Sequence, residues 1–234
     1  MKSLIRLYMA PLCLLVARFA AASTLLDPGD VQVVAYASDN PEAFAFVTWV
    51  EINEGTDIYF TDKGWDCDGF TFGETVIKYT VPETLVPGSV RSFQSGASNP
   101  GWKIVSGGVI FSIYGDQLIV YQGTVENPRL LYAFDNTGGW ESCDQVATKK
   151  TRHSALPTGL VDEETAVSFA HADNFWYRPD SPIAGSLLLL KANLVDPDRF
   201  VATSKNSVRV QDYQVPASFT IHARPSEDSI AAES

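Results

Sequence analysis

The chain has 234 residues, of which 45% are hydrophobic and 19% are charged, and its formal net charge at pH 7 is −11. Such an acidic surface repels the phosphate backbone of nucleic acids, so the composition argues against nucleic-acid binding. The apolar stretches that follow the N-terminal segment are too short for a membrane span, which needs roughly 20 apolar residues.

The first 22 residues have the order of a secretory signal peptide. Lys2 and Arg6 precede the apolar run "LYMAPLCLLVA", which is followed by the small residues "AAAS". We expect cleavage after Ala22 and an extracellular location. The remaining chain of about 212 residues has the size of one sizeable domain, which we place at residues 23–223.

Strand signals dominate the chain up to residue 171. They are short runs of β-branched and aromatic residues separated by turns such as "NEG", "SNPG" and "SGG". Many short strands with this spacing predict an all-β sandwich. The predicted strands are 31–37, 43–52, 56–61, 75–81, 88–94, 109–115, 116–123, 129–135 and 165–171, with a last one at 217–223.

One helix is expected in the C-terminal region, in "SPIAGSLLLLKANLVDP". Ser181 is suited to cap it, Pro182 to its first turn, and Pro197 marks its end. Residues 224–234 are polar and lack aromatic side chains, and we expect a disordered tail there.

Two of the three cysteines remain after removal of the leader, which contains Cys13. Cys67 and Cys143 lie in similar contexts, "GWDCD" and "GWESCD". In an oxidising compartment an even pair is most simply a disulfide. A nucleophilic thiol or a metal ligand is the alternative, although neither cysteine has a histidine near it in the sequence.

Several runs resemble a little-studied secreted β-domain family of bacterial and exported surface proteins. They are "DPGDVQVVAYASDNPEAFAFVTWVEINEGTDIYFTDKGW", "YGDQLIVYQG", "LPTGLVDEETAVSFAHADNFWY" and the segment ending at "DPDRF". The first block is also similar in plan to lamin-tail domains, which are immunoglobulin-like sandwiches. The resemblance implies an attachment or recognition module, with no defined catalytic residues to transfer.

The acidic stretch "FTDKGWDCDGF" suggests a calcium loop at Asp62, Asp66 and Asp68. Calcium takes six to eight oxygen ligands, which closely spaced aspartates and carbonyls supply. The spacing differs from that of an EF-hand. The alternative is a solvated acidic turn in an acidic protein.

A histidine and an aspartate lie two residues apart in "HADN". On a strand, His171 and Asp173 would point to one face and form half of a metal or general-base site. A metal-dependent hydrolase that uses this pair is the competing hypothesis for the function. Polar residues at a strand end more often fix a turn.

Five aromatic residues fall in turns or at strand ends: Trp65, Trp102, Trp140, Trp176 and Tyr177. Exposed rings there could stack on a sugar or a partner protein, and the candidates for this role are Trp65, Trp140, Trp176 and Tyr177. The alternative is that Trp65 and Trp140 pack over the disulfide as a small satellite core. The favoured hypothesis is a secreted, non-catalytic binding or structural module with a polysaccharide or an extracellular protein as its partner.

Overall fold

The computed structural model describes residues 22–149, 153–204 and 215–222. Except for Ala22, the leader predicted at residues 1–22 and the tail predicted at residues 224–234 lie outside these ranges.

One sheet has five antiparallel strands in the order β12-β10-β1-β2-β5. Its outer strands are therefore β12 and β5. The bounds are β1 Val31–Ala37, β2 Ala43–Thr48, β5 Val90–Gln94, β10 Asn174–Tyr177 and β12 Phe200–Thr203.

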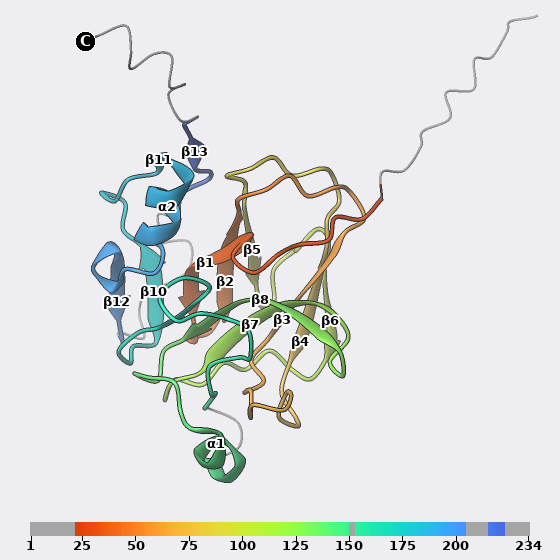
Figure 1. The fold of residues 1–234 in the computed structure, drawn as a ribbon, viewed down its shortest axis with the longest axis vertical. Coiled ribbons are helices and arrows are strands. Elements are labelled where there is room, and N and C mark those ends of the chain that lie inside the picture. Colours follow the sequence, from red (N-terminus) through yellow and green to blue (C-terminus); the bar gives the residue numbers. More distant parts are fainter. Residues whose placement is uncertain (1–21, 150–152, 205–214, 223–234) are drawn as a thin grey trace, which may run out of the picture.

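The second sheet has six strands in the order β6-β4-β3-β7-β8-β9, and only β8 and β9 run parallel. The bounds are β3 Asp57–Thr61, β4 Val76–Thr80, β6 Trp102–Ser106, β7 Gln117–Gly123, β8 Pro128–Asp135 and β9 Ala166–Ser168. A short parallel pair, β11 Ala184–Gly185 with β13 Thr220–Ile221, lies apart from both sheets. The helices α1 (Cys143–Lys149) and α2 (Leu187–Asn193) lie at opposite ends of the molecule (Figure 1), and a 3-10 turn covers Pro197–Arg199.

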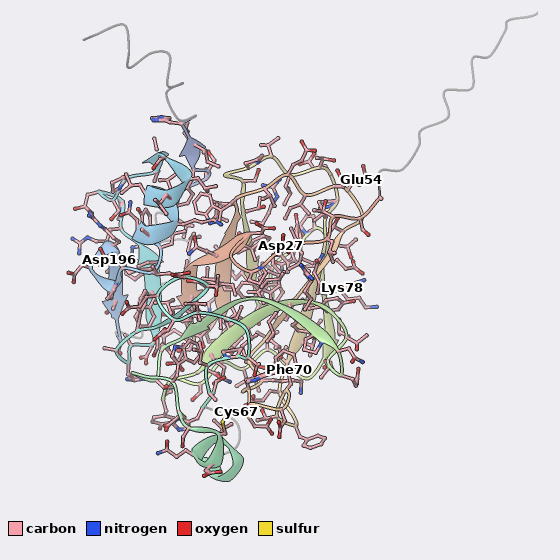
Figure 2. The ribbon with its side chains drawn as sticks, in the orientation of Figure 1. Asp27, Glu54, Cys67, Phe70, Lys78 and Asp196 are labelled. Atoms are coloured by element: carbon pink, nitrogen blue, oxygen red, sulfur yellow. A yellow bond between two sulfur atoms is a disulfide. The ribbon has the colours of Figure 1, made fainter. Side chains whose placement is uncertain are left out.

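Aromatic side chains from both sheets meet in the main core. The Phe44 and Phe60 ring centroids are 4.9 Å apart, and those of Tyr36 and Phe134 are 5.1 Å apart. Each pair joins one strand of the five-stranded sheet to one of the six-stranded sheet, and side chains fill the space between them (Figure 2). Burial of these inner faces drives the two sheets together, and the predicted all-β sandwich is confirmed.

A second core covers the outer face of the six-stranded sheet. Along β7, Leu118 and Val120 enter the main core, while Ile119 and Tyr121 enter this second cluster. Residues of two loops, among them Trp65 after β3 and Leu160 before β9, cover this cluster on its solvent side. Both faces of β7 are therefore buried, which explains why its sequence is apolar at successive positions.

Most predicted strands are present, several of them one to five residues shorter, but the strand predicted at 109–115 is wrong. That segment is a loop in which Phe111 turns inward and stacks on Tyr36 at 5.0 Å, while Ile110 and Tyr114 are exposed. A strand that the sequence analysis missed, β6, precedes it. Strands β10 and β12 and helix α1 were also missed.

The C-terminal helix is shorter than predicted. Its N-cap is Ser186, whose hydroxyl accepts from the Leu189 N–H, rather than Ser181. The preceding Ala184 and Gly185 are extended because they pair with Thr220 and Ile221. In the ranges that the structure describes, neither helix has the length and apolar character needed to cross a membrane.

Candidate functional site

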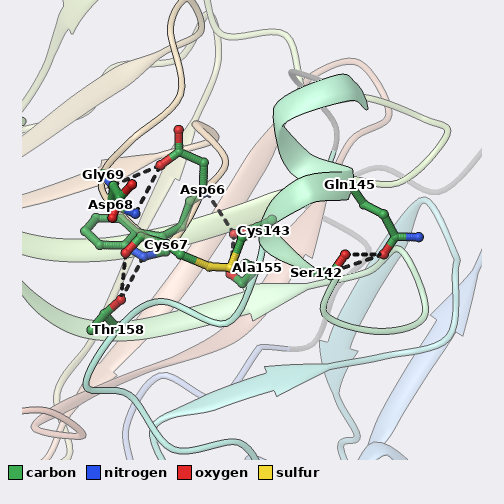
Figure 3. The surroundings of a disulfide bond; sticks show 11 residues. Asp66, Cys67, Asp68, Gly69, Ser142, Cys143, Gln145, Ala155 and Thr158 are labelled. Atoms are coloured by element: carbon green, nitrogen blue, oxygen red, sulfur yellow. Dashed lines mark hydrogen bonds between the residues drawn. A yellow bond between two sulfur atoms is a disulfide. The ribbon is translucent and has the colours of Figure 1, made fainter.

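The predicted disulfide is confirmed. Cys67, in the loop after β3, is bonded to Cys143, the first residue of α1, and 76 positions separate them in the sequence. Hydrogen bonds reinforce this junction (Figure 3): the Thr158 hydroxyl donates to the Cys67 carbonyl, and the Ala155 N–H donates to the Trp65 carbonyl. Two loops over the outer face of the six-stranded sheet are thus held together covalently and by backbone contacts.

Trp65 does not face a ligand. Its side chain is 6% exposed, packs edge-on against Phe70 at 5.2 Å, and donates its indole N–H to Thr158 Oγ1. Trp140 packs on the same second core and donates its indole N–H to Asp162 at 2.8 Å. Both tryptophans therefore pack in a small second core near the disulfide, which was the alternative to a ligand-binding role.

Tyr177 is also turned inward. It is fully buried, its hydroxyl donates to the Pro182 carbonyl at 2.8 Å, and its ring packs against Phe200 and Phe219. Trp176 faces the other side of β10 and is half-buried beside the small side chains Ala37 and Ala43. Successive strand residues point to opposite faces, so the two aromatics cannot share a binding surface.

The three aspartates proposed for calcium do not form a common site. Asp62 points into the protein and accepts from the Thr75 N–H at 2.6 Å. Asp66 accepts from the N–H groups of Asp68 and Gly69 in its own turn, and Asp68 is exposed. Across the described ranges, no group of three or more His, Cys, Asp or Glu side chains could hold a metal ion.

His171 and Asp173 lie 3.7 Å apart, from Nε2 to Oδ1. The segment that carries them is not a strand, since β9 ends at Ser168. The histidine Nε2 is 3.0 Å from the Ile113 carbonyl and donates to it. Burial and then the Asp39 carboxylate raise the pKa of Asp173. The pair ties the 109–115 loop to the chain before β10.

A buried polar cluster lies at one end of three neighbouring interior strands of the six-stranded sheet, β3, β7 and β8. It contains Asp62 after β3, Asp116 before β7 and Asp135 at the end of β8. Burial raises the pKa of Asp62 and of Asp135 to about 6, although hydrogen bonds to both carboxylates act in the opposite direction. Burial also raises the pKa of Asp116 well above its usual range. Desolvation of a carboxylate favours its protonated form.

The hydroxyl group of Tyr36 reaches this cluster without forming a hydrogen bond. The residue is fully buried and its oxygen has no partner among the described residues. Burial, followed by the charges of Asp116, Asp62 and Asp135, raises its pKa well above the usual value. A buried hydroxyl without a partner costs stability.

An open groove of about 680 Å³ lies between β5 and β6, the outer strands of the two sheets. Its volume is within the range of roughly 300–1,000 Å³ that is typical of ligand pockets. Trp102 forms its floor, half-buried, with its ring 4.5 Å from that of Tyr79 and 5.6 Å from that of Phe93. The same ring also packs against Phe44 and Phe60 of the main core, with centroids 5.3 and 5.2 Å away.

Asn99 fixes the loop that joins β5 to β6. Its side-chain oxygen accepts from the Gln94 N–H at 3.0 Å, and its Nδ2 donates to the Gln94 carbonyl at 2.8 Å. Arg91 donates to the Val90 carbonyl and lies 3.6 Å from Glu83. One wall of the groove is therefore rigid.

Comparisons with protein-family models, with curated proteins and with solved structures find no match to this chain. The resemblance to lamin-tail domains stays a hypothesis.

This groove was not among the sites predicted from the sequence. Trp102 was one of several aromatic residues near a turn, and the strand that begins with it was missed. The signal that could have found it is "SNPGW", a Pro-Gly turn between two short apolar runs that would bring the tryptophan to a sheet edge.

Proposed function

We propose that this protein is a secreted, non-catalytic binding or structural module of the extracellular matrix or cell surface. Its ligand, a polysaccharide or an extracellular protein, is bound in the groove between β5 and β6. The observation that carries this proposal is the half-buried aromatic side chain of Trp102, which lines that groove.

Two further observations support the proposal. Two hydrogen bonds between the Asn99 side chain and the Gln94 backbone hold one wall of the groove in place, which lowers the entropy lost when a ligand binds. The order of residues 1–22 predicts export, and a disulfide such as Cys67–Cys143 persists in oxidising compartments. The immunoglobulin-like, lamin-tail-like arrangement belongs to the same proposal, with the resemblance as its support.

The hydrolase hypothesis is favoured by no specific observation. Asp173 is buried, and the His171 Nε2 proton is engaged by the Ile113 carbonyl.

The test is retention of the purified protein on a panel of immobilised polysaccharides and extracellular matrix proteins. We expect at least one surface to retain the protein, and Ser98→Trp to abolish retention because the new ring would fill the groove. Leu188→Trp places the same ring on α2, on an exposed side chain outside the groove, and should leave retention unchanged. Retention that survives Ser98→Trp would exclude the groove as the binding site.

A further inference from the structure

A second open groove, the α2 groove, lies along helix α2 and shares no lining residue with the groove between β5 and β6. Its volume of about 410 Å³ is within the range of roughly 300–1,000 Å³ that is typical of ligand pockets. Its apolar lining comes from α2 and the residues that follow: Leu188, Ala192 and Val195. The turn before β9 contributes two exposed residues, Glu163 and Glu164. The α2 groove therefore combines apolar and acidic surface.

Hydrogen bonds hold the acidic turn in one conformation. The N–H groups of Thr165 and Ala166 donate to the Val161 carbonyl at 2.9 and 3.0 Å, and the Val161 N–H donates to the Thr165 hydroxyl at 2.8 Å. Glu163 has a φ of 61°, which is uncommon for a residue with a side chain. In the described ranges, neither the Glu163 nor the Glu164 carboxylate forms a hydrogen bond or an ion pair. Both carboxylates can therefore pair with a cation of a ligand.

Lys191 contributes an ammonium group to the same groove. Its Nζ lies 3.7 Å from the position that a Cβ would take on Gly29, and the Thr165 methyl group lies 3.1 Å from that position. Burial lowers the pKa of Lys191, although the Asp30 carboxylate acts in the opposite direction. Among the residues that the structure describes, this ammonium has neither a hydrogen-bond acceptor nor an ion-pair partner. A carbonyl oxygen of a ligand would give the half-buried donor an acceptor.

We propose that the α2 groove binds a short extended segment of a partner protein, in which a basic side chain stands beside an apolar one. The basic side chain pairs with Glu163 and Glu164, the apolar one covers the α2 wall, and a backbone carbonyl accepts from Lys191. Charge complementarity favours this partner, because a chain with a formal net charge of −11 attracts basic segments. The segment is extended because the carbonyls inside a helix are already bonded within the helix. This site is separate from the groove of the proposed function.

The test is calorimetric titration of the purified protein with short capped peptides. The probe peptide alternates lysine and leucine, and two reference peptides replace its lysines by glutamate or its leucines by serine. We expect the probe to bind and each reference peptide to bind at least about tenfold more weakly. Spermine, which has amines but no apolar side chain, should not displace the probe. No binding of the probe, equal binding of the serine peptide, or displacement by spermine would overturn the inference.

The double variant Glu163→Gln with Glu164→Gln removes the acidic contact and should weaken probe binding about tenfold. The matched control is Glu54→Gln with Asp68→Asn, which changes the net charge equally at exposed residues outside the α2 groove. It should change the affinity by less than about twofold. Equal weakening in both double variants would mean that only the overall charge attracts the peptide, and would overturn the site.

Lys191→Met separates hydrogen bonding from charge. Loss of the donor should weaken probe binding about fivefold, whereas loss of a positive charge alone would strengthen the binding of a basic peptide. Stronger binding would therefore overturn the contact to Lys191. Thermal unfolding identifies any variant that fails to fold.

The two grooves can be tested independently. Leu188→Trp changes the apolar wall of the α2 groove and should weaken probe binding, whereas Ser98→Trp changes only the groove between β5 and β6 and should not. If Ser98→Trp blocks the probe and Leu188→Trp does not, the peptide binds between β5 and β6. That result would overturn this inference while the proposed function stands.

Discussion

The Asp62 carboxylate accepts a 2.6 Å hydrogen bond from the backbone N–H of Thr75, at a position where the aspartate is only 2% exposed. This contact sets the start of β4 against the end of β3. It also places a charge where water does not reach, and the hydrogen bond offsets only part of the desolvation penalty.

The first prediction concerns pH. Burial raises the folded-state pKa of Asp62 and Asp135 to about 6, from an ordinary value of 3.8. Between these values the folded protein binds more protons than the unfolded chain, so stability rises as pH falls and is lost as pH rises through 6. From pH 7.5 to pH 5 we expect each carboxyl to add about 1 kcal/mol, and the melting temperature to rise by about 5 °C.

The variant Asp62→Asn tests the cause of this pH dependence. An amide oxygen can still accept from Thr75 but carries no charge, so the melting temperature at pH 7.5 should rise and its pH dependence should flatten. Asp68→Asn removes an exposed carboxyl and is the control. A melting temperature that falls between pH 7.5 and pH 5 in the unmodified protein would contradict the prediction.

The second prediction compares two fully buried tyrosines. The Tyr36 hydroxyl has no partner among the described residues, whereas the Tyr177 hydroxyl donates to Pro182. We expect Tyr36→Phe to leave the free energy of unfolding unchanged or to raise it by about 1 kcal/mol, and Tyr177→Phe to lower it by about 1 kcal/mol. Urea denaturation measures both. Equal losses would show that Tyr36 has a partner, such as a buried water.

The third prediction concerns the disulfide. Replacing Cys67 and Cys143 together by serine should lower the free energy of unfolding by about 2–4 kcal/mol, because the bond closes a long loop in the unfolded chain. The two sheets have their own core and should persist, so the far-ultraviolet circular dichroism should not change. Limited proteolysis should then cut first in the loops around residues 67 and 143. Cleavage that begins within the strands would mean that the bond supports the whole sandwich.

The fourth prediction concerns the groove wall. Asn99→Ala removes both side-chain bonds to the Gln94 backbone and should cost about 1–2 kcal/mol of stability. It should also weaken ligand binding, because the loop that carries Ser98 loses its support. Ser98→Ala leaves these bonds in place and is the control for stability. If Ser98→Ala lowers the stability as much as Asn99→Ala does, the loss does not come from the two hydrogen bonds of the Asn99 side chain.

The sequence determined the local elements and the covalent link. Period-two runs such as 75–81 predicted strands because alternate residues of a strand face opposite sides. The even pair of cysteines that remains beyond the predicted leader predicted the bond between Cys67 and Cys143 by elimination. Helix α2 was predicted too long, because the pairing of Ala184–Gly185 with Thr220–Ile221 depends on residues far along the chain.

The environment of each polar or aromatic side chain was decided by the tertiary structure. Asp62, Asp66 and Asp68 lie close together in the sequence, yet one is buried and one is exposed, because the chain turns out of β3 between them. Trp65 and Trp102 each lie beside a turn, but only Trp102 reaches an open groove. That groove exists because β5 and β6, joined by one short loop, are outer strands of different sheets. Sequence patterns report periodicity within a segment, whereas exposure depends on which distant segments pack against it.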